Sequence, residues 1–277
     1  MKISASHLKP TFAGKVAYHL LPVRRKVVTD NIRLVFGDSL TEKERLGLAQ
    51  NFYGHLWKLL VENLTTGFLS QDQIRQRVKV VDDYHIADGL KLKKGVLLMT
   101  GHFGNWELAP VGGMLHFPQW RGKFHVLRRA IVNKTIEKIL FRRFYAAGLD
   151  IIPKKRSLDR VLDALARNEI VTFIMDQHAK PGKDGVVVDF FGKKAGTFKS
   201  LAMVARSTGA PIVPSASYRE EDGTHVMCFY PPLTWVEDDD FDKEILINTK
   251  IYNETMEKMV LEHPTQWWWV HKRWKIK

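Results

Sequence analysis

The spacing of hydrophobic residues along the chain changes near residue 95. Between Thr41 and Asn63 apolar residues recur at helical spacing, and Glu44 follows Thr41 by three residues, as in a capping box, so we expect a helix there. From Gly95 to Thr100 the chain instead has a short continuous apolar run, which is typical of a strand buried on both faces. The first 90 residues are therefore expected to be mostly helical and to precede an α/β core.

Strand-like and helix-like patterns alternate beyond residue 95. We expect strands at about 123–127, 149–153, 170–175, 186–191, 211–218 and 225–230, and helices at about 133–147, 157–168, 197–208 and 241–262, with Ser157 and Thr197 as helix caps. This alternation predicts the α/β class, with a mostly parallel central sheet flanked by helices. We assign residues 1–90 to an N-terminal helical, membrane-surface segment and residues 91–277 to one compact α/β core.

The start of the chain has an amphipathic pattern. Phe12, Val16, Leu20 and Val23 are spaced for one helical face, with lysines and arginines around them. No uncharged apolar run approaches the roughly 20 residues that span a bilayer, so we expect no transmembrane helix. The segment is expected either to lie flat on an anionic membrane or to pack on the rest of the domain.

Composition narrows the range of partners and compartments. Lys and Arg number 43 against 30 Asp and Glu, and this balance of +13 favours an anionic partner such as lipid headgroups, nucleic acid or an acidic protein. The single cysteine, Cys228, excludes an internal disulfide and a Cys-based zinc site. We expect it to be an inert strand residue in a protein that faces the cytoplasm.

The first candidate for chemistry directly follows the apolar run at 95–100. His102 and Glu107 lie five residues apart at the carboxyl end of that strand, where open α/β sheets build their active sites. A histidine held by a carboxylate suits the removal of a proton from an alcohol, although only a turn, and not a regular helix, would bring this pair together. The alternative is a helix-capping histidine beside a surface acid.

A second group follows the strand at 170–175. Asp176, Gln177 and His178 are expected at the same edge of the sheet, where Asp176 either binds substrate or a cationic side chain or is an ordinary polar cap. A basic group flanks this edge and suits phosphates, carboxylates or an oxyanion, unless it is simply a solvated helix face; its members are Arg128, Arg129, Arg142 and Arg143.

Other chemistries have little support in the sequence. The motifs of serine hydrolases, nucleotide-binding loops, zinc peptidases and dinucleotide-binding folds are absent, and we expect no metal site. The tail is rich in aromatic and basic residues that suit a bilayer interface, but we expect at least half of its tryptophans to pack inward; they are Trp267, Trp268, Trp269 and Trp274.

Together these motifs resemble the bacterial lipid A biosynthesis acyltransferases, in the lysophospholipid acyltransferase superfamily. The matching segments occur in the family's order; they are Arg24-Arg25-Lys26 with Asn31 to Phe36, His102 with Glu107, Arg129 with Asn133, Arg142 or Arg143 before Gly148, Asp176-Gln177, Phe190-Phe191-Gly192 with Ala195 and Thr197, and Trp269 to Lys275. Two features depart from the family pattern. His178 stands where a second aspartate is common, and the membrane-spanning helix with which members usually begin has no counterpart.

The resemblance implies a glycerolipid acyltransferase-like fold and transfer of a fatty acyl group to a hydroxyl of a membrane lipid, a lipid A-type glycolipid. The donor would be acyl carrier protein or coenzyme A as co-substrate, with no cofactor and no metal. The resemblance makes His102 the base and Glu107 its carboxylate, with substrate-binding roles for Arg129, Arg142, Arg143, Asp176 and Gln177. It implies a peripheral enzyme on the cytoplasmic face of the bacterial inner membrane. Its expected partners are the lipid acceptor, the carrier protein and the anionic membrane surface, and not nucleic acid.

Two alternatives stay open at this point. Within the enzyme class, the acceptor is a lysophospholipid or another specialised lipid. In a different class, the chain is a basic membrane-binding or nucleic-acid-binding protein without catalysis.

Overall fold

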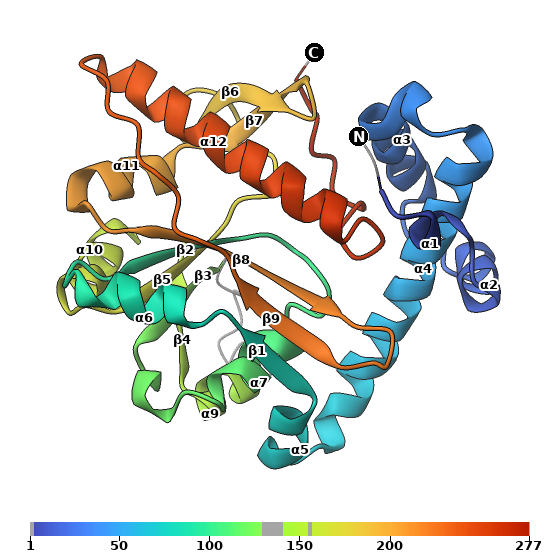
Figure 1. The fold of residues 1–277 in the computed structure, drawn as a ribbon, viewed down its shortest axis with the longest axis horizontal. Helices are drawn as coiled ribbons and strands as arrows, with labels where there is room; N and C mark the ends of the chain where they lie inside the picture. The colour runs from blue at the N-terminus through green and yellow to red at the C-terminus, as the bar shows by residue number, and fades with distance from the viewer. Residues whose placement is uncertain (1–2, 129–140, 155–156, 277) are drawn as a thin grey trace.

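The computed structural model describes residues 3–128, 141–154 and 157–276. Its centre is a seven-stranded sheet with the strand order β1-β9-β8-β2-β5-β3-β4 (Figure 1). The strands are β1 (Val78–Val81), β2 (Val96–Thr100), β3 (Phe124–Arg128), β4 (Leu149–Pro153), β5 (Ile170–Ile174), β8 (Ile212–Arg219) and β9 (His225–Phe229). The predicted class, a mostly parallel sheet flanked by helices, is confirmed.

The pairing of the strands fixes where their ends lie. Parallel pairing joins β4 to β3, β3 to β5, β5 to β2 and β2 to β8, while β9 runs antiparallel to β8 and parallel to β1. In the pair formed by β2 and β5, Thr100 lies opposite Ile174. The two chains therefore leave the sheet side by side, at the edge where the sequence places both candidate groups.

Helices cover both faces of the sheet and bury one apolar core on each. One face packs against α10 (Leu158–Ala166), α11 (Ser200–Thr208) and α12 (Phe241–Glu262). The other packs against α5 (Gln71–Gln76), α6 (Tyr84–Lys91), α7 (Leu108–Met114) and α9 (Arg142–Ala147). Strands β2 and β5, in the middle of the sheet, are almost wholly buried, as their continuous apolar runs predicted.

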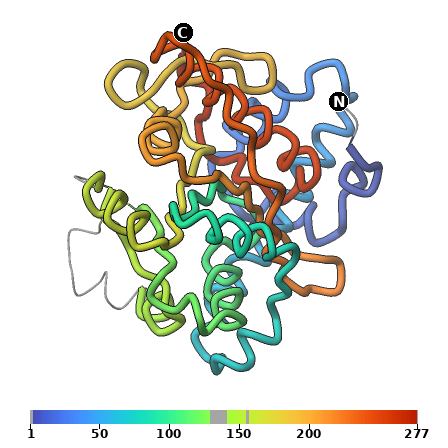
Figure 2. Tube along the Cα trace, turned by 60° about the vertical axis from the view of Figure 1, so that its left-hand side comes forward, coloured from blue at the N-terminus to red at the C-terminus, as the bar shows by residue number. Residues whose placement is uncertain are grey.

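The N-terminal helices are α1 (Ala5–Leu8), α2 (Phe12–Leu20), α3 (Arg25–Phe36) and α4 (Glu42–Thr65), and short 3-10 turns occupy Gly37–Ser39, Thr66–Phe68 and Pro118–Trp120. The predicted capping box of α4 is confirmed, since Thr41 and Glu44 exchange hydrogen bonds. Asn31 donates to the carbonyl oxygens of Trp269 and His271, both at 2.8 Å. The N-terminal helices and the C-terminal tail therefore lie side by side, as Figures 1 and 2 show.

Two parts of the structure differ from the sequence-based prediction. Strand β1 lies within the first 90 residues and joins the sheet, so the sheet begins before the predicted boundary. The helix expected from Thr197 begins only at Ser200, because residues Lys193–Phe198 form β7, which pairs antiparallel with β6 (Gly185–Phe190). Both residues of the turn, Phe191 and Gly192, have positive φ, as a tight hairpin turn with the twist of its strands requires.

The C-terminal tail packs inward for two of its four tryptophans. Trp267 and Trp269 are buried in the core, which confirms the expectation for at least half of them. The tail forms a β-bridge to the turn, between Phe103 and Trp267. Within the described ranges, no helix has both the length and the apolar composition needed to cross a bilayer.

Candidate active site

Two side chains meet where β2 and β5 leave the sheet. The His102 Nδ1 atom lies 2.9 Å from Asp176 Oδ1, and the backbone N–H of His102 donates to Asp176 Oδ2 at 2.8 Å. Gly101 permits this approach, because an added Cβ there would lie 3.1 Å from the Cβ of Asp176. Asp176 therefore holds both the ring and the backbone of His102, which fixes the ring's direction.

The structure corrects the predicted partner of His102. Glu107 was expected to hold the imidazole, but its carboxylate accepts a hydrogen bond from Arg128 at 3.2 Å. The guanidinium of Arg128 also lies over the ring of Phe141, 4.1 Å from its centroid. The turn between His102 and Glu107 leads into α7, which begins at Leu108. An imidazole held by a carboxylate is present, but the carboxylate is Asp176.

The charges around this pair make His102 more basic. Burial lowers the pKa of His102, but the charge and hydrogen bond of Asp176, with a smaller contribution from Glu107, outweigh it and raise the pKa above its ordinary value. Burial likewise raises the pKa of Asp176, and the contacts with His102 outweigh this and lower it. The aspartate is therefore ionised at neutral pH and suited to orient a basic histidine.

Aromatic side chains enclose the pair. The indole N–H of Trp267 donates to Asp176 Oδ2 at 3.1 Å. The ring of Trp106 stands edge-on to the His102 imidazole, with 5.3 Å between their centroids. The side chain of Asp176 is 2% exposed and that of His102 is 17% exposed, so the carboxylate is sealed while the imidazole still reaches solvent.

The predicted arginines occupy different positions. Arg143 lines a cavity of about 50 Å³ together with Glu107, and its guanidinium lies against Gly67, where an added Cβ would be 2.9 Å from Nη2. Arg142 is exposed on the first turn of α9. Of these two, only Arg143 lies beside the site. Gln177 is half-buried next to Asp176, and Arg129 lies outside the described residues.

Two residues around the site gave little or no signal in the sequence. Asn105, within the turn, is fully buried and accepts hydrogen bonds from the backbone N–H groups of Glu107 and Leu108 at 3.3 and 3.0 Å. Trp267 stands out only as part of an aromatic tail. Nothing in the local pattern marks the role of either residue, because their partners are distant in sequence.

Metal-binding and thiol groups take no part in this arrangement. Within the described ranges, no three or more His, Cys, Asp or Glu side chains are grouped so as to hold a metal ion. Cys228 lies in β9, where burial raises the pKa of its thiol to about 11. It therefore stays protonated near neutral pH, as expected of an inert strand cysteine.

Comparison with known proteins adds to this geometry. The family model of bacterial lipid A biosynthesis acyltransferases matches residues 4–276. The chain is 26% identical over 265 residues to the lipid A biosynthesis lauroyltransferase of Escherichia coli K12. The aligned region covers 95% of this chain and 83% of that protein. It is 22% identical over 230 residues to the phosphatidylinositol mannoside acyltransferase of Mycolicibacterium smegmatis, covering 80% of this chain and 69% of that protein.

Among solved structures, the chain is similar to the 1-acyl-sn-glycerophosphate acyltransferase of Thermotoga maritima. The TM-score is 0.40 and the identity 12%, over 86% of this chain and 96% of that one. The family model, in contrast, matches nearly every residue from the N-terminal helices to the tail. The chain therefore belongs to the bacterial lipid A biosynthesis acyltransferase family and is an O-acyltransferase.

Proposed function

We propose that this enzyme transfers a fatty acyl group from a thioester of acyl carrier protein or coenzyme A to a hydroxyl of a membrane glycolipid of the lipid A type, with His102 as the general base. The observation that carries the proposal is the contact between His102 Nδ1 and Asp176 at the carboxyl edge of the sheet. Relatives named as lipid A and phosphatidylinositol mannoside acyltransferases support a glycolipid acceptor.

The geometry supports a different role for each nitrogen of the imidazole. Because Asp176 is ionised, it accepts a hydrogen bond from Nδ1–H and leaves Nε2 as the proton acceptor. Nε2 removes the proton of the lipid hydroxyl while the hydroxyl oxygen attacks the thioester carbonyl. The tetrahedral intermediate then expels the thiolate, to which His102 returns the proton. No covalent enzyme intermediate is required.

Cationic side chains beside the site suit the anionic groups of both substrates. Arg128 and Arg143 flank Glu107. A guanidinium can form a bidentate pair of hydrogen bonds with a phosphate. We propose that Arg143 binds an acidic group of the lipid or carrier and that Glu107 holds Arg128 in place.

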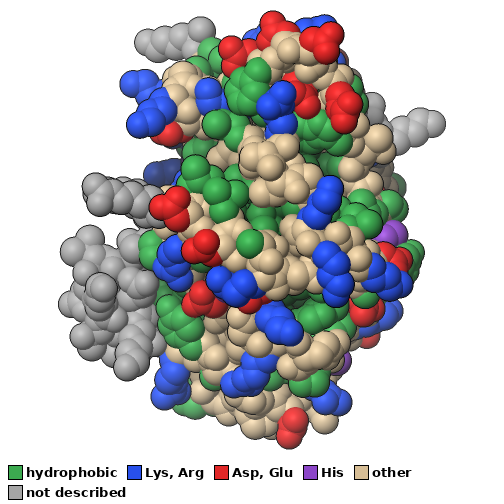
Figure 3. Space-filling model, turned by 90° about the vertical axis from the view of Figure 1, so that its left-hand side faces the viewer, with side chains coloured by type: hydrophobic (Ala, Val, Ile, Leu, Met, Phe, Trp, Pro, Cys, Tyr) green, Lys and Arg blue, Asp and Glu red, His purple; other side chains and the backbone are tan. Residues whose placement is uncertain are grey.

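On the face that carries α6 and α10, Lys and Arg are spread out and interspersed with acidic side chains (Figure 3).

The N-terminal helices suit a peripheral position on an anionic membrane, which we propose to be the cytoplasmic face of the inner membrane. Helix α2 packs on α4 through its small residues, Gly14 and Ala17, and turns its larger apolar residues outward. Phe12 is 84% exposed and Phe68, just beyond α4, is 90% exposed. Other exposed apolar side chains on these helices are Val16, Leu20, Leu46, Trp57, Leu60, Val61 and Leu64. Exposed apolar surface of this extent favours a lipid partner.

The general-base assignment is tested with His102→Ala and a matched control. His125→Ala removes another buried histidine, held by Asp150 and Glu169 at 3.1 and 2.7 Å but placed at the opposite end of the sheet. Loss of a general base should lower the acyl-transfer rate by about 100- to 10,000-fold, whereas His125→Ala should affect stability alone. Normal transfer by folded His102→Ala protein would disprove the proposal.

The substrates are tested with purified enzyme and labelled donors. Acyl carrier protein and coenzyme A thioesters are each offered with a lipid A precursor, a phosphatidylinositol mannoside and a lysophospholipid in vesicles. We expect the lipid A precursor to be acylated fastest; faster transfer to the lysophospholipid would show that the acceptor class is wrong. Leu64→Glu should weaken binding to anionic vesicles. Leu158→Glu on α10 should not, since that position is also exposed, at 56% against 66% for Leu64, but lies away from the N-terminal helices.

A further inference from the structure

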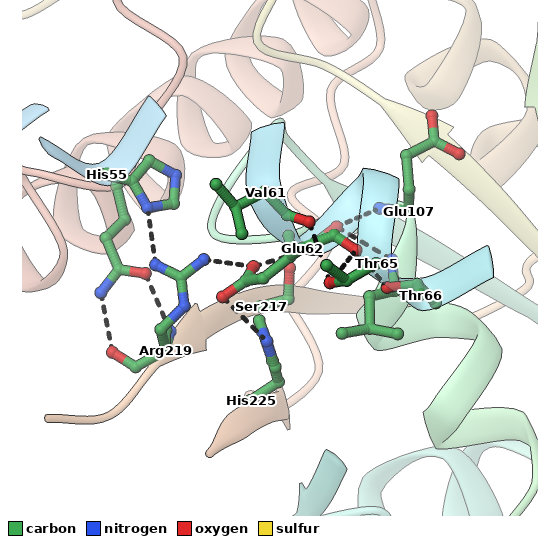
Figure 4. Close-up of polar contacts among 12 residues, drawn as sticks. His55, Val61, Glu62, Thr65, Thr66, Glu107, Ser217, Arg219 and His225 are labelled. Atoms are coloured by element: carbon green, nitrogen blue, oxygen red, sulfur yellow. Dashed lines mark hydrogen bonds and ion pairs between the residues drawn. The ribbon is translucent and has the colours of Figure 1, made fainter. Parts of the chain in front are cut away.

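A buried polar cluster joins α4 to the turn that carries His102 and Glu107. At its centre is the carboxylate of Glu62, which contacts one residue each from the turn, β8 and β9 (Figure 4). Asn105 Nδ2 donates to Glu62 Oε2 at 3.0 Å, Arg219 forms an ion pair with the same oxygen, and His225 Nε2 lies 3.5 Å from Glu62 Oε1. The side chain of Glu62 is only 20% exposed, and those of its partners are almost fully buried.

Both ends of the Asn105 amide are used. Its oxygen accepts the N–H groups of Glu107 and Leu108, where α7 begins, and its nitrogen donates to Glu62. An aspartate at this position would keep the acceptor but place a carboxylate against that of Glu62. The amide therefore connects the turn to a helix that is 43 residues away in sequence.

A second connection reaches the turn through the tail. The backbone N–H of Arg219 donates to Gln266 Oε1 at 2.8 Å, and Gln266 Nε2 donates to the carbonyl oxygen of Arg219 at 2.9 Å. The carbonyl oxygen of Gln266 then accepts the N–H of Gly104 at 3.0 Å. Arg219 Nη1 also contacts His55 Nδ1 on α4, at 3.2 Å. The turn is thus tied at two adjacent residues, Gly104 and Asn105.

The charge state of the cluster suits a permanent link. Burial raises the pKa of Glu62, but hydrogen bonds from His225 and Arg219 outweigh it and lower the pKa to about 2. Burial, with the nearby charge of Arg219, lowers the pKa of His55 to about 3. Glu62 is therefore an anion and His55 is neutral near neutral pH, so the Asn105 amide donates to a carboxylate.

We propose that Glu62 and Asn105 are positioning residues, which hold the turn so that His102 faces Asp176 at one end while Glu107 faces Arg128 at the other. The carboxylate of Glu107 points away from the cluster in Figure 4, so Glu62 contacts the turn through the Asn105 side chain and not through Glu107. The proposal rests on the proposed function, because it requires the His102 site to carry out the transfer. A misplacement of about 1 Å at such a site can cost about 100-fold in rate.

The test uses an exchange of the two groups. Asn105→Asp sets two carboxylates against each other, and Glu62→Gln removes the charge that Asn105 meets. The double variant Glu62→Gln/Asn105→Asp again has one amide and one carboxylate at the contact, in exchanged positions. We measure kcat and KM for the acyl thioester, together with the thermal unfolding midpoint of each variant.

We expect kcat to fall by about 100-fold in Asn105→Asp, with little change in KM, because the turn moves while Arg143, the residue proposed to bind an acidic group of the substrates, lies on α9 and not on the turn. The double variant should recover at least about tenfold of that loss, as a coupled pair does in a double-mutant cycle. Wild-type kcat in folded Asn105→Asp, or losses that simply add in the double variant, would overturn the proposal. If Asn105→Asp fails to fold, the proposal requires that Glu62→Gln alone lower kcat by a larger factor than the factor by which it changes KM.

A matched control separates positioning from stability. Glu244 on α12 is a buried carboxylate that also accepts hydrogen bonds, from Arg206 and from Trp235 Nε1, but far from the turn. Glu244→Gln should lower the unfolding midpoint and leave kcat unchanged; an equal fall in kcat would show that the effect of Glu62 is general destabilisation. Normal activity in His102→Ala would refute the proposed function itself. An inactive His102→Ala together with a fully active Asn105→Asp would refute only the positioning role of Glu62 and Asn105.

Discussion

Replacing Asp176 by asparagine should reverse the tautomer of His102. Asp176 Oδ2 accepts two N–H groups, from the His102 backbone and from Trp267, so the amide oxygen of an asparagine must take that place. Its NH2 group then faces His102 Nδ1. Since the NH2 group can only donate, Nδ1 must accept and Nε2 must carry the proton. A histidine in that state cannot remove a proton from the lipid hydroxyl.

The expected loss follows from the chemistry of the base. The same reversal in a histidine–aspartate pair of serine proteases lowers kcat by about 10,000-fold, and at 1.36 kcal/mol per tenfold this is a loss of about 5 kcal/mol of transition-state stabilisation. Asp176→Ala should be impaired no more severely than Asp176→Asn, because without any side-chain partner His102 can still adopt the reactive tautomer part of the time.

The assay is single-turnover transfer from a labelled acyl thioester to acceptor lipid in vesicles, which separates chemistry from product release. Asp150→Asn is the matched control, because Asp150 holds His125 Nδ1 at 3.1 Å in the same way but away from the site. We expect Asp150→Asn to keep its transfer rate. A folded Asp176→Asn that transfers at the wild-type rate, or an Asp176→Ala that is clearly slower than Asp176→Asn, would refute the tautomer argument.

Three further predictions concern pH, stability and the backbone. Because His102 acts unprotonated and its pKa is raised, kcat/KM should rise with pH through an inflection above 6.5. Glu107→Gln removes a charge that raises the pKa of His102, so the inflection should move to lower pH. A pH–rate profile of Glu107→Gln with an unmoved inflection would contradict the assignment of this inflection to His102. Glu62 has a pKa of about 2 in the folded protein against an ordinary 4.5, so its contribution to stability is complete above pH 4.5 and is lost as the pH falls toward 2. Between pH 4.5 and 2, the free energy of unfolding in urea should therefore depend less on pH in Glu62→Gln than in the wild type. Gly104 has φ +53° and an added Cβ would lie 2.6 Å from a carbonyl oxygen of β8, so Gly104→Ala should lower the unfolding midpoint more than Gly122→Ala, which has φ +78° but open space.

The elements with a strong periodic pattern were predicted closely. The strands at 96–100, 149–153 and 170–174 and the helix at 241–262 lie where their hydrophobic runs placed them. The pattern succeeds there because burial on both faces requires continuous apolar residues. It failed at Lys193–Phe198, where the strand has lysines at its start and its hairpin turn is Phe-Gly, and not the Asn-Gly or Asp-Gly that signals such a turn.

The amphipathic segment at the start of the chain shows a different limit. Its apolar face was found in the sequence, but spacing alone could not say whether that face turns toward the protein. Gly14 and Ala17 decide the matter, since an added Cβ at Gly14 would lie 2.7 Å from the carbonyl oxygen of Gln50. The small residues allow α2 to approach α4 closely, and the large apolar ones are left outside.

The partner of His102 was misassigned because it was sought along the chain instead of across the sheet. Strands β2 and β5 pair with Thr100 opposite Ile174, so residues at equal distances beyond these two also lie side by side, about 4.8 Å apart as neighbouring strands are. His102 and Asp176 each stand two positions beyond the paired residues and therefore meet without any special turn. Glu107 is separated from His102 by the turn that Asn105 fixes, and that turn directs its carboxylate to Arg128. In a parallel sheet, the register of two strands is thus a better guide to which side chains share a site than their separation in sequence.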